Sequence, residues 1–428
     1  KREAIAGEGQ GQSLIDALDD SFQDTPPEAF IGLRNSGRQL CYQNAALQML
    51  YWSPFRQALL LSCQPMLQVP AKAQERLALW MGVRQSRLQA GLPVRLAEER
   101  AMQCRPSIQS AVFPKEPVTS RRSLTLALCG MFQRMYKSNA LTGTVGGGLS
   151  KANRASGGMF PLMRQCDSQE FVAFLLAQLR DEVLVSRGDT DGYSLGGEAV
   201  ALFLGTVTRC VSCVCCGSTQ LRPDPFLSLS VPVVPGSLSD CLRAYTHPVY
   251  LSGSDTRVCD TCGIKQDATM CAHVTSLPPL LLVHLMRFKH TAYGTEKVNT
   301  RVRLDRTLSI SDLEGVVPAG TDMGGRHYTL IGVVAHIGDG SHSGHYISYV
   351  RVEGTALSNG TEAGVEGEGV MEGGTPDPDP DPAYVWIECD DSSMTVIPPA
   401  AMDSLEGGGE GRARGFERIS AYMCLYAM

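Results

Sequence analysis

The spacing of apolar residues changes along the chain, and the change predicts a helical part followed by a β part. Over residues 30–90, and again over 121–136, apolar side chains recur at the three- and four-residue intervals of one helix face. Residues 165–184 form the clearest predicted helix, because an apolar stripe follows a typical start signal. Asp167 is a suitable N-cap residue, and Glu170 lies three positions after it, as in a capping box.

Beyond residue 199, short runs rich in β-branched and aromatic residues predict strands. The expected strands are residues 227–233, 280–286, 328–335, 345–352, 384–388 and 421–426. Helices come first and antiparallel-looking strands follow, rather than alternating with them. This order predicts an α+β fold.

Two stretches contain too few apolar residues to build a core. Residues 1–29 are polar and carry Pro26 and Pro27 near their end, so we expect a flexible lead-in. Residues 353–382 are rich in Gly and Glu and end in repeated Asp-Pro. Because they lie between two expected strands, we expect a disordered insertion.

Composition narrows the classes of function. The chain has 428 residues, of which 43% are hydrophobic, enough for two or three subdomains. Its net charge of −6 argues against nucleic acid as the main partner, and no apolar run is long enough to cross a membrane. The 15 cysteines, without a secretion signal, favour metal binding or thiol chemistry in a reducing compartment. We therefore expect a cytoplasmic or nuclear location.

Cys41 lies where a cysteine can become reactive. It follows a segment containing Gly32 and Gly37 and begins a helical pattern over residues 41–51, which Pro54 is expected to stop. A thiol at a helix N-terminus meets unpaired N–H groups and the positive end of the helix dipole, and both favour the nucleophilic thiolate. The alternative is that Cys41 is a buried small hydrophobic residue.

A thiolate nucleophile needs a base within hydrogen-bond reach. His345 lies where a Gly/Ser-rich loop enters an expected strand, a position that can present a side chain at a cleft. This placement favours His345 over His336 and His342, which lie at the end of the preceding strand and in the loop. An inert loop histidine is the alternative.

The base in turn needs a group that orients it. Residues 386–391 read Trp-Ile-Glu-Cys-Asp-Asp, a strand that ends in two acids. Either Asp390 or Asp391 can hold an imidazole in this position. Two solvated acids at a strand end are the alternative.

A second group of cysteines has the composition of a metal site. Cys259 and Cys262 form one Cys-x-x-Cys pair, and the other is either Cys210 with Cys213 or Cys213 with Cys216. Two such pairs supply four thiolates, which structural zinc prefers. The long separation between the pairs leaves zinc ligation and unrelated cysteines as competing interpretations.

Taken in order, these motifs resemble the catalytic domain of the ubiquitin-specific proteases, the papain-like deubiquitinases. The resemblance spans residues 31–426. Its motifs are a cysteine box at 32–50, Gln-Cys-Asp-Ser-Gln-Glu-Phe at 165–171, Asp-Pro-Phe-Leu-Ser-Leu-Ser at 224–230, the two cysteine pairs, His-Leu-Met-Arg-Phe at 284–288, Lys-Val-Asn at 297–299, a histidine box at 328–349, the acidic strand at 386–391 and a closing strand at 421–426.

The resemblance implies a papain-like fold described as a hand, with a helical thumb, a β palm and β fingers that carry zinc. By family position we expect the thumb at residues 30–198, the fingers at 199–275 and the palm at 276–428. The spacing to the Asp-Pro-Phe motif favours Cys216 over Cys210. The expected ligands of a structural Zn²⁺ are therefore Cys213, Cys216, Cys259 and Cys262.

The resemblance also assigns roles in catalysis. Cys41 becomes the nucleophile, His345 the base and Asp390 the residue that orients the base. Asn35 becomes the oxyanion-hole side chain, and Asp391 a supporting acid. The implied activity is thiol-dependent hydrolysis of the isopeptide bond after the C-terminal Gly-Gly of ubiquitin, with ubiquitin and ubiquitinated proteins as partners.

Three residues are expected to bind the substrate. By family position Asp167 pairs with the arginine of the ubiquitin tail, while a role as helix cap alone is the alternative. Phe288 and Tyr346 are expected to line the cleft, and ordinary core packing is their alternative.

Two loops depart from the family pattern. The step from Asn35 to Cys41 is one residue longer than usual, and so is the loop before His345. These departures support one alternative, a catalytically weak or dead relative that binds ubiquitin as a scaffold. A protease that acts on another ubiquitin-like modifier is a second alternative.

Overall fold

The computed structural model divides the chain into two compact units, and each is described by itself. The first unit comprises residues 1–21, 54–161 and 174–200, and the second comprises 22–53, 162–173 and 201–428. The structure describes residues 32–35, 39–67, 124–137, 159–160, 164–186, 197–292, 294–309, 312–313, 316–318, 327–338, 340, 344–353, 384–407 and 419–428. The predicted lead-in, and all but the first residue of the predicted insertion, lie outside the described residues.

The helical spacing predicted α2 (Cys41–Tyr51), α3 (Pro54–Leu67), α7 (Leu124–Lys137) and α9 (Ser168–Ser186). The short helices α10 (Gly197–Ala201) and α11 (Leu238–Thr246) were not predicted. Helix α2 ends before Pro54, as predicted, but Pro54 itself begins α3. Proline suits the first turn because its missing N–H would have no intrahelical partner there. Among the described helices, none combines the length and apolarity needed to cross a bilayer.

In the first unit, Glu182 of α9 supplies acceptors to the start of α7. Its carboxylate accepts from the backbone N–H of Leu124 at 2.6 Å and of Thr125 at 3.1 Å. A carboxylate at a helix N-terminus satisfies unpaired N–H groups and interacts favourably with the helix dipole. Farther along, the rings of Phe55 and Phe132 meet edge to face with centroids 6.4 Å apart.

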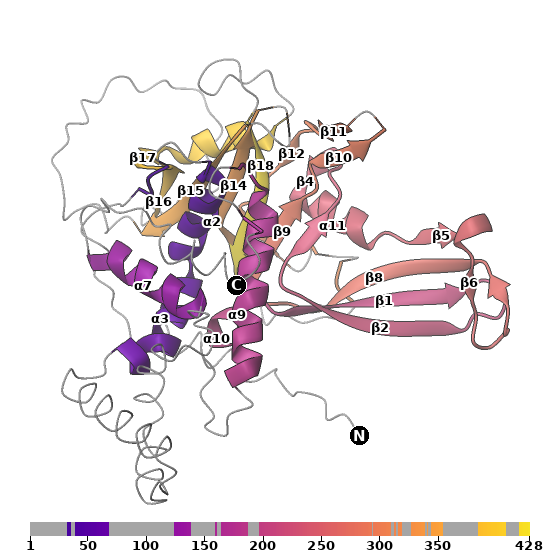
Figure 1. The fold of residues 1–428 in the computed structure, drawn as a ribbon. Coiled ribbons are helices and arrows are strands. Elements are labelled where there is room, and N and C mark those ends of the chain that lie inside the picture. Colours follow the sequence, from indigo (N-terminus) through magenta and orange to yellow (C-terminus); the bar gives the residue numbers. More distant parts are fainter. Residues whose placement is uncertain are drawn as a thin grey trace, which may run out of the picture. The chain divides into compact units, whose positions relative to one another are not determined.

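The predicted strands all belong to one eight-stranded sheet in the second unit (Figure 1). Its main path runs β17 (Ser393–Ile397), β16 (Tyr384–Asp390), β15 (His345–Glu353), β14 (Tyr328–Ile337), β18 (Ile419–Ala427), β9 (Leu280–Leu285) and β3 (Leu229–Val231), with β13 (Thr307–Leu308) paired to β14. Every neighbouring pair is antiparallel except β3 with β9. The predicted α+β class is confirmed.

Burial follows the apolar pattern of the strands. Each residue of β9 is buried, including His284, and its largely apolar sequence suits a strand inside a sheet. Its neighbour β18 is buried along nearly its whole length. Helix α2 packs against β15 and also contacts β14 and β16. This packing holds the start of α2 beside the strands that carry His345 and the two acids.

A second sheet has four antiparallel strands in the order β2 (Thr219–Phe226), β1 (Gly205–Cys213), β8 (Ala268–Ser276) and β5 (Val249–Leu251). Figure 1 shows β1, β2 and β8 as long strands running side by side. The short hairpin of β6 (Arg257–Val258) and β7 (Lys265–Gln266) follows β5 in the chain. The range 199–275 also contains β3, a strand of the eight-stranded sheet, and the expected bounds of thumb, fingers and palm stay a prediction.

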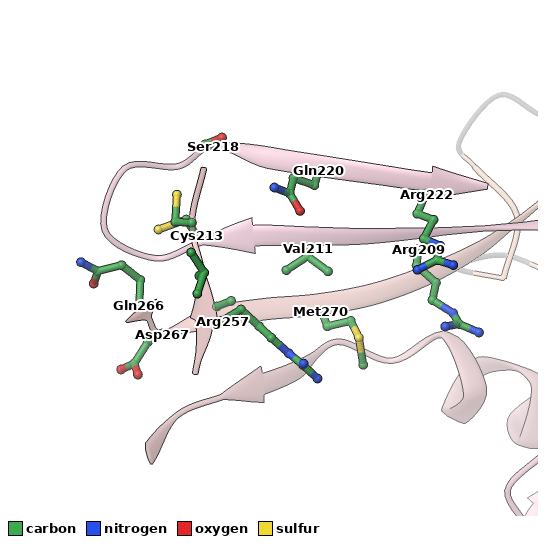
Figure 2. A pocket seen from close by; sticks show the side chains of 13 residues that line it. Arg209, Val211, Cys213, Ser218, Gln220, Arg222, Arg257, Gln266, Asp267 and Met270 are labelled. Carbon is green, nitrogen blue, oxygen red and sulfur yellow. The ribbon is translucent and has the colours of Figure 1, made fainter. Parts of the chain in front are cut away.

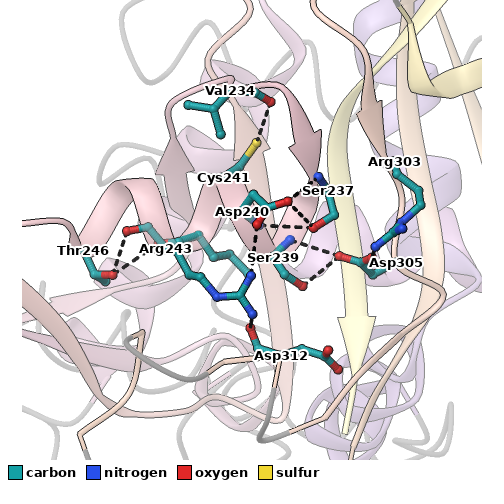
Figure 3. Close-up of polar contacts among 11 residues, drawn as sticks. Val234, Ser237, Ser239, Asp240, Cys241, Arg243, Thr246, Arg303, Asp305 and Asp312 are labelled. Atoms are coloured by element: carbon teal, nitrogen blue, oxygen red, sulfur yellow. Dashed lines mark hydrogen bonds and ion pairs between the residues drawn. The ribbon is translucent and has the colours of Figure 1, made fainter.

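Polar contacts fix the start of α11 (Figure 3). Ser237 and Asp240 form a capping box, in which Asp240 N donates to Ser237 Oγ at 3.2 Å and Ser237 N donates to Asp240 Oδ2 at 2.8 Å. The Ser237 N–H holds the pKa of Asp240 below its usual value. Ser239 donates to Asp305 Oδ2 through its backbone N–H at 3.0 Å and its hydroxyl at 2.8 Å. The cap and this link fix α11 beside the loop that follows β12 (Val302–Arg303).

Arg287 is fully buried and holds three segments together. Its Nε donates to Ala421 O at 2.6 Å, and its Nη1 donates to Val298 O at 3.0 Å and Thr300 O at 2.9 Å. Its Nη2 lies 3.5 Å from Glu406 O, in the helical turn η4 (Pro399–Glu406). Burial lowers the pKa of Arg287 to about 10. Carbonyl oxygens therefore compensate much of the cost of burying this charge.

Candidate active site

Cys41 is the first residue of α2, the position that the sequence predicted. Its side chain is 4% exposed, and the preceding Leu40 is the N-cap residue without a side-chain cap. The helix therefore starts at the thiol with no neighbouring side chain competing for its first turn. This arrangement leaves Cys41 at the positive end of the helix dipole.

His345 lies between Cys41 and Asp390. Its Nε2 is 2.6 Å from Asp390 Oδ1, and its side chain also hydrogen-bonds with Cys41. The bond with Asp390, followed by the bond with Cys41, raises the pKa of His345 to about 10. His345 begins β15 and Asp390 ends β16, and antiparallel pairing brings these two ends together. The imidazole is therefore held in its charged form beside the thiol.

His336, the second histidine considered from the sequence, is in a different environment. It is fully buried on β14, and burial lowers its pKa to about 3. Its ring meets the rings of Phe288 and Tyr346 edge to face, with centroids 5.2 Å and 4.8 Å apart. A neutral histidine packed in this way belongs to the core. His342, the third, lies outside the described residues.

Asp391, the second acid, holds the segment before Cys41. Its Oδ2 accepts from Asn35 Nδ2 at 3.0 Å, and its Oδ1 accepts from Asn44 Nδ2 at 2.7 Å. Asn35 Oδ1 accepts from Leu40 N at 2.9 Å. The side-chain amide of Asn35 is therefore held by the backbone of the residue that precedes Cys41. Backbone contact adds to this, since Leu33 N donates to Asp391 O at 2.6 Å. The supporting role expected of Asp391 thus takes the form of positioning Asn35.

The turn that carries Asp391 explains two residue choices. Asp391 has a φ of +50°, a conformation that Asp and Asn tolerate better than most residues. It shares a two-residue hairpin turn with Ser392, since Asp390 pairs with Ser393. Gly32 passes so close to this turn that a Cβ there would lie 2.3 Å from Ser392 O. Only glycine allows the segment before Cys41 to approach the acids.

Gln165 joins the two loops of the site, a role that the sequence did not reveal. Its backbone N–H donates to Gln39 Oε1 at 2.5 Å, and its side-chain amide donates to Gly344 O at 3.0 Å. Gln39 lies just before Cys41, and Gly344 lies just before His345. Gly344 has a φ of +137°, which favours glycine. Its presence in the Gln-Cys-Asp motif was the only sequence signal for Gln165.

Asp167 caps α9, as the alternative interpretation held. Its Oδ1 accepts from the backbone N–H of Gln169 at 2.7 Å and of Glu170 at 3.0 Å. Its Oδ2 accepts a short hydrogen bond from the hydroxyl of Tyr422. The carboxylate is half-buried and retains lone pairs for another donor. Capping therefore accompanies, and does not exclude, the expected contact with a substrate arginine.

The expected cleft residues lie in one aromatic cluster. Tyr422 stacks at a tilt on Phe288 and Tyr346, with centroids 5.5 Å and 5.7 Å apart, and meets His284 edge to face at 4.7 Å. Phe288 is half-buried, whereas Tyr346 is 1% exposed. Burial lowers the pKa of His284 to about 4. Tyr346 is thus a packed residue of the cluster, whereas Tyr422 links the cluster to Asp167 through its hydroxyl.

The four cysteines chosen as metal ligands lie together in the second unit. The ligand atoms of Cys213, Cys216, Cys259 and Cys262 all lie within 4.8 Å of one another, and the Sγ atoms of Cys216 and Cys259 are 3.5 Å apart. Cys262 N approaches Cys259 Sγ at 3.5 Å, and this backbone contact lowers the pKa of Cys259 to about 7. A compact four-thiol group with N–H donors fits a metal ion. Cys210 lies outside this group, whereas Cys216, the expected member of the first pair, lies within it.

A pocket of about 370 Å³ lies over β1, β2 and β8, away from Cys41 (Figure 2). Its lining includes Arg209, Arg222 and Arg257, together with Val211 and Met270. Arg209 and Arg222 both pair with Asp224, at 3.4 Å and 3.3 Å. None of the residues around Cys41 lines this pocket. It therefore adds a basic surface to the four-stranded sheet and takes no part in the thiol site.

Comparison with known proteins shows which family the sequence matches. The model of the family described as "Ubiquitin carboxyl-terminal hydrolase" matches residues 31–426. Among curated proteins, "Probable ubiquitin carboxyl-terminal hydrolase 9" of Schizosaccharomyces pombe is 29% identical over 260 residues, covering 60% of this chain and 39% of that protein. Human "Ubiquitin carboxyl-terminal hydrolase 3" is 31% identical over 232 residues, covering 45% of this chain and 43% of that protein. The chain thus spans less than half the length of these two relatives.

A third relative and a solved structure are also similar to this chain. Mouse "Ubl carboxyl-terminal hydrolase 18" is 30% identical over 203 residues, covering 45% of this chain and 52% of that protein. The structure of the SAGA Ubp8/Sgf11/Sus1/Sgf73 DUB module bound to ubiquitin aldehyde matches with a TM-score of 0.58 and 17% identity, over 97% of this chain and 73% of that chain. At this identity the likeness shows a shared fold.

Proposed function

Since the chain belongs to the ubiquitin carboxyl-terminal hydrolase family, we propose that it is a thiol-dependent deubiquitinase. Its reaction is hydrolysis of the isopeptide bond after the C-terminal Gly-Gly of ubiquitin. The observation that carries the proposal is His345, held between the Cys41 thiol and the Asp390 carboxylate. A nucleophile, a base and a group that orients the base are the parts that thiol hydrolysis requires.

The contacts of His345 support a definite sequence of proton transfers. Asp390 holds Nε2, so Nδ1 faces the thiol and the charged ring pairs with the Cys41 thiolate. The thiolate attacks the carbonyl carbon, and the imidazolium gives its proton to the leaving lysine amine. The neutral imidazole then takes one proton from a water molecule, whose oxygen attacks the thioester. The carbon–sulfur bond breaks, the ubiquitin carboxylic acid loses its proton to solvent, and the Cys41 thiolate and the His345 imidazolium are restored.

Asn35 is suited to stabilise the oxyanion of the tetrahedral intermediate. Its amide oxygen is fixed by Leu40 N, and one amide hydrogen is fixed by Asp391. The other amide hydrogen is available to a substrate oxygen, because an amide nitrogen carries two donors. The two fixed contacts set this donor before the substrate arrives, which is how an oxyanion hole gains its effect. The longer step from Asn35 to Cys41 is thus compatible with a positioned amide.

Asp167, Phe288 and Tyr346 are proposed to receive the ubiquitin tail. Tyr422 fixes one oxygen of Asp167, and the backbone of α9 fixes the other, so the carboxylate has one orientation. A fixed carboxylate recognises an arginine at little entropic cost. Phe288 offers a half-buried ring to the tail. Tyr346 supports that ring indirectly, because Tyr346 packs against His336 and His336 packs against Phe288.

For the four-cysteine group we propose a structural Zn²⁺. Thiolate ligands in this number are typical of closed structural zinc sites. The ion would join the turn after β1 to the β6–β7 hairpin, and it has no part in the reaction. Cys259→Ser is expected to lower the zinc content by about one ion per chain. Cys215→Ser, which changes an exposed cysteine outside the group, is the matched control.

A ubiquitin C-terminal fluorogenic amide tests the activity. Wild type is expected to release the fluorophore, and Cys41→Ala is expected to be inactive while remaining folded by circular dichroism. Absence of turnover by the folded wild-type chain would refute the proposal. A ubiquitin vinyl sulfone probe then tests the scaffold alternative, because a scaffold binds the probe without forming a covalent adduct.

The name of the mouse relative favours one further candidate function. That protein is described as a Ubl hydrolase, so a ubiquitin-like modifier is a second possible substrate. The same fluorogenic amide on ubiquitin and on ubiquitin-like modifiers gives kcat/KM for each. We expect the highest kcat/KM with ubiquitin. A higher kcat/KM with another modifier would show that this modifier, and not ubiquitin, is the preferred substrate.

A further inference from the structure

A second group of possible metal ligands lies on the four-stranded sheet and has no part in the proposed function. Cys210 is on β1, and Cys271 and His273 are on β8. Their ligand atoms, two thiol sulfurs and one imidazole nitrogen, all lie within 4.8 Å of one another. All three side chains are half-buried, and both cysteines are free thiols.

The strand register places the three side chains on one face of the sheet. Cys210 is directly opposite Cys271 in the antiparallel pair of β1 and β8. His273 is two residues beyond Cys271, and side chains two apart in a strand point to the same face. The grouping therefore follows from the backbone pairing and does not depend on one side-chain rotamer. Cys213, three residues after Cys210, points to the opposite face.

The opposite face is already occupied by other features. Val211, Cys213 and Met270 line the pocket shown in Figure 2, and they alternate with Cys210 and Cys271 along the two strands. The three-ligand group and the four-cysteine group are therefore separate. Each can gain or lose an ion without sharing a ligand with the other.

The spacing of the three groups fits tetrahedral coordination. The Sγ of Cys271 lies 3.8 Å from His273 Nε2, and the side chains of Cys210 and Cys271 hydrogen-bond with each other. Zinc bonds of about 2.3 Å to sulfur and about 2.0–2.1 Å to nitrogen place a sulfur about 3.6 Å from a nitrogen at the tetrahedral angle. The observed separation needs only a small adjustment of the side chains.

The environment of the other ring nitrogen of His273 also supports a bound ion. His273 Nδ1 is buried and has no hydrogen-bond partner among the described groups. A buried polar atom without a partner is costly, and water or a bound group normally satisfies it. An ion held at Nε2 would fix the ring and leave Nδ1 as an N–H donor for an ordered water.

We propose that Cys210, Cys271 and His273 form a second Zn²⁺ site, which joins β1 to β8 across the middle of the four-stranded sheet. Two thiolates and one imidazole are ligands that zinc prefers, and three protein ligands leave one tetrahedral position for water or an external donor. Binding releases the thiol protons to solvent, so the ion replaces the hydrogen bond between the two cysteines.

Zinc stoichiometry on the full chain tests the site. The protein is kept reduced, stripped with a chelator, reloaded with zinc alone, and its metal content measured by mass spectrometry. Wild type is expected to hold about two ions per chain, whereas Cys271→Ser and His273→Phe hold about one. His273→Cys, which replaces one zinc ligand with another, is expected to restore two ions. Circular dichroism checks that each variant is folded.

Two controls separate this site from the four-cysteine group. Cys215→Ser removes an exposed thiol outside both groups and should keep two ions. Cys259→Ser should lose only the ion of the four-cysteine group and keep the ion bound through Cys271. The proposal is overturned if reloaded wild type holds one ion, or if His273→Phe keeps the wild-type content. A disulfide between Cys210 and Cys271 that persists in the presence of reductant would also overturn it.

Discussion

The contact between Asp390 and His345 offers the sharpest test of the proposed site. In Asp390→Asn a neutral amide replaces the carboxylate that lies 2.6 Å from Nε2. The substitution keeps the size of the side chain and removes its negative charge. Since this contact is the largest cause of the raised pKa of His345, the imidazolium should lose its proton at lower pH.

The size of the effect follows from the type of hydrogen bond. A hydrogen bond to a charged group contributes about 1.5–3 kcal/mol. At about 1.4 kcal/mol per pKa unit, its loss lowers the pKa of His345 by roughly 1–2 units. The same free energy lost from the transition state lowers kcat/KM by about 10- to 150-fold. The wild-type starting point is a pKa of about 10, raised from 6.5.

The pH dependence has a defined sign. The ion pair stabilises the fold fully below pH 6.5, and its contribution is lost as pH rises through about 10. In catalysis, the alkaline limb of kcat/KM reports the loss of the imidazolium proton. Asp390→Asn is therefore expected to move this limb to lower pH by about 1–2 units.

The assay is kcat/KM for the ubiquitin fluorogenic amide across the alkaline range, with circular dichroism at each pH. Asp403→Asn is the matched control, because Asp403 is 67% exposed and pairs with Arg306 far from His345 in the sequence. It should leave both the rate and the limb unchanged. An alkaline limb at the same pH in Asp390→Asn and wild type would show that Asp390 does not hold the imidazolium.

Three further predictions concern residues that position the site or stabilise its sheet. Asp391→Ala frees the oxyanion-hole amide and should lower kcat by up to about 10²–10³-fold with little change in KM; unchanged kcat would contradict this. Arg287→Met should lower the free energy of unfolding by at least about 1–3 kcal/mol, the cost of one unpaired buried carbonyl. In urea denaturation, Arg180→Met should cost less, because Arg180 and its partner Asp181 are both exposed; equal losses would refute the role of the buried guanidinium. Ser237→Ala should cost about 1 kcal/mol by removing a helix cap, whereas Ser252→Ala, at a cap without a side-chain bond, should not, and equal Tm values would contradict this.

The sequence by itself determined four helices, α2, α3, α7 and α9, and six strands of the large sheet, β3, β9, β14, β15, β16 and β18. Their apolar positions repeat at helical or strand spacing, and burial of one face or of both faces enforces those patterns. The β9 segment is the clearest example, because the apolar run over residues 280–283 favours a strand that is buried on both faces. The strands β1, β2 and β8 were missed, since they are half-exposed and carry no regular alternation.

The sequence also supplied Cys41, His345 and the acidic pair, because each follows a signal in its own segment, such as a helix start or a strand end. The local signals left open which acid holds the imidazole and which cysteine completes the four-cysteine group, and only the family resemblance favoured Asp390 and Cys216. Those choices depend on distances between segments that are far apart in the chain. Antiparallel pairing of β15 with β16 brings Asp390 within hydrogen-bond distance of His345. The hairpin turn after β16 places Asp391 against Asn35. Only the tertiary structure sets such distances, because local propensity carries no information about which strand ends meet.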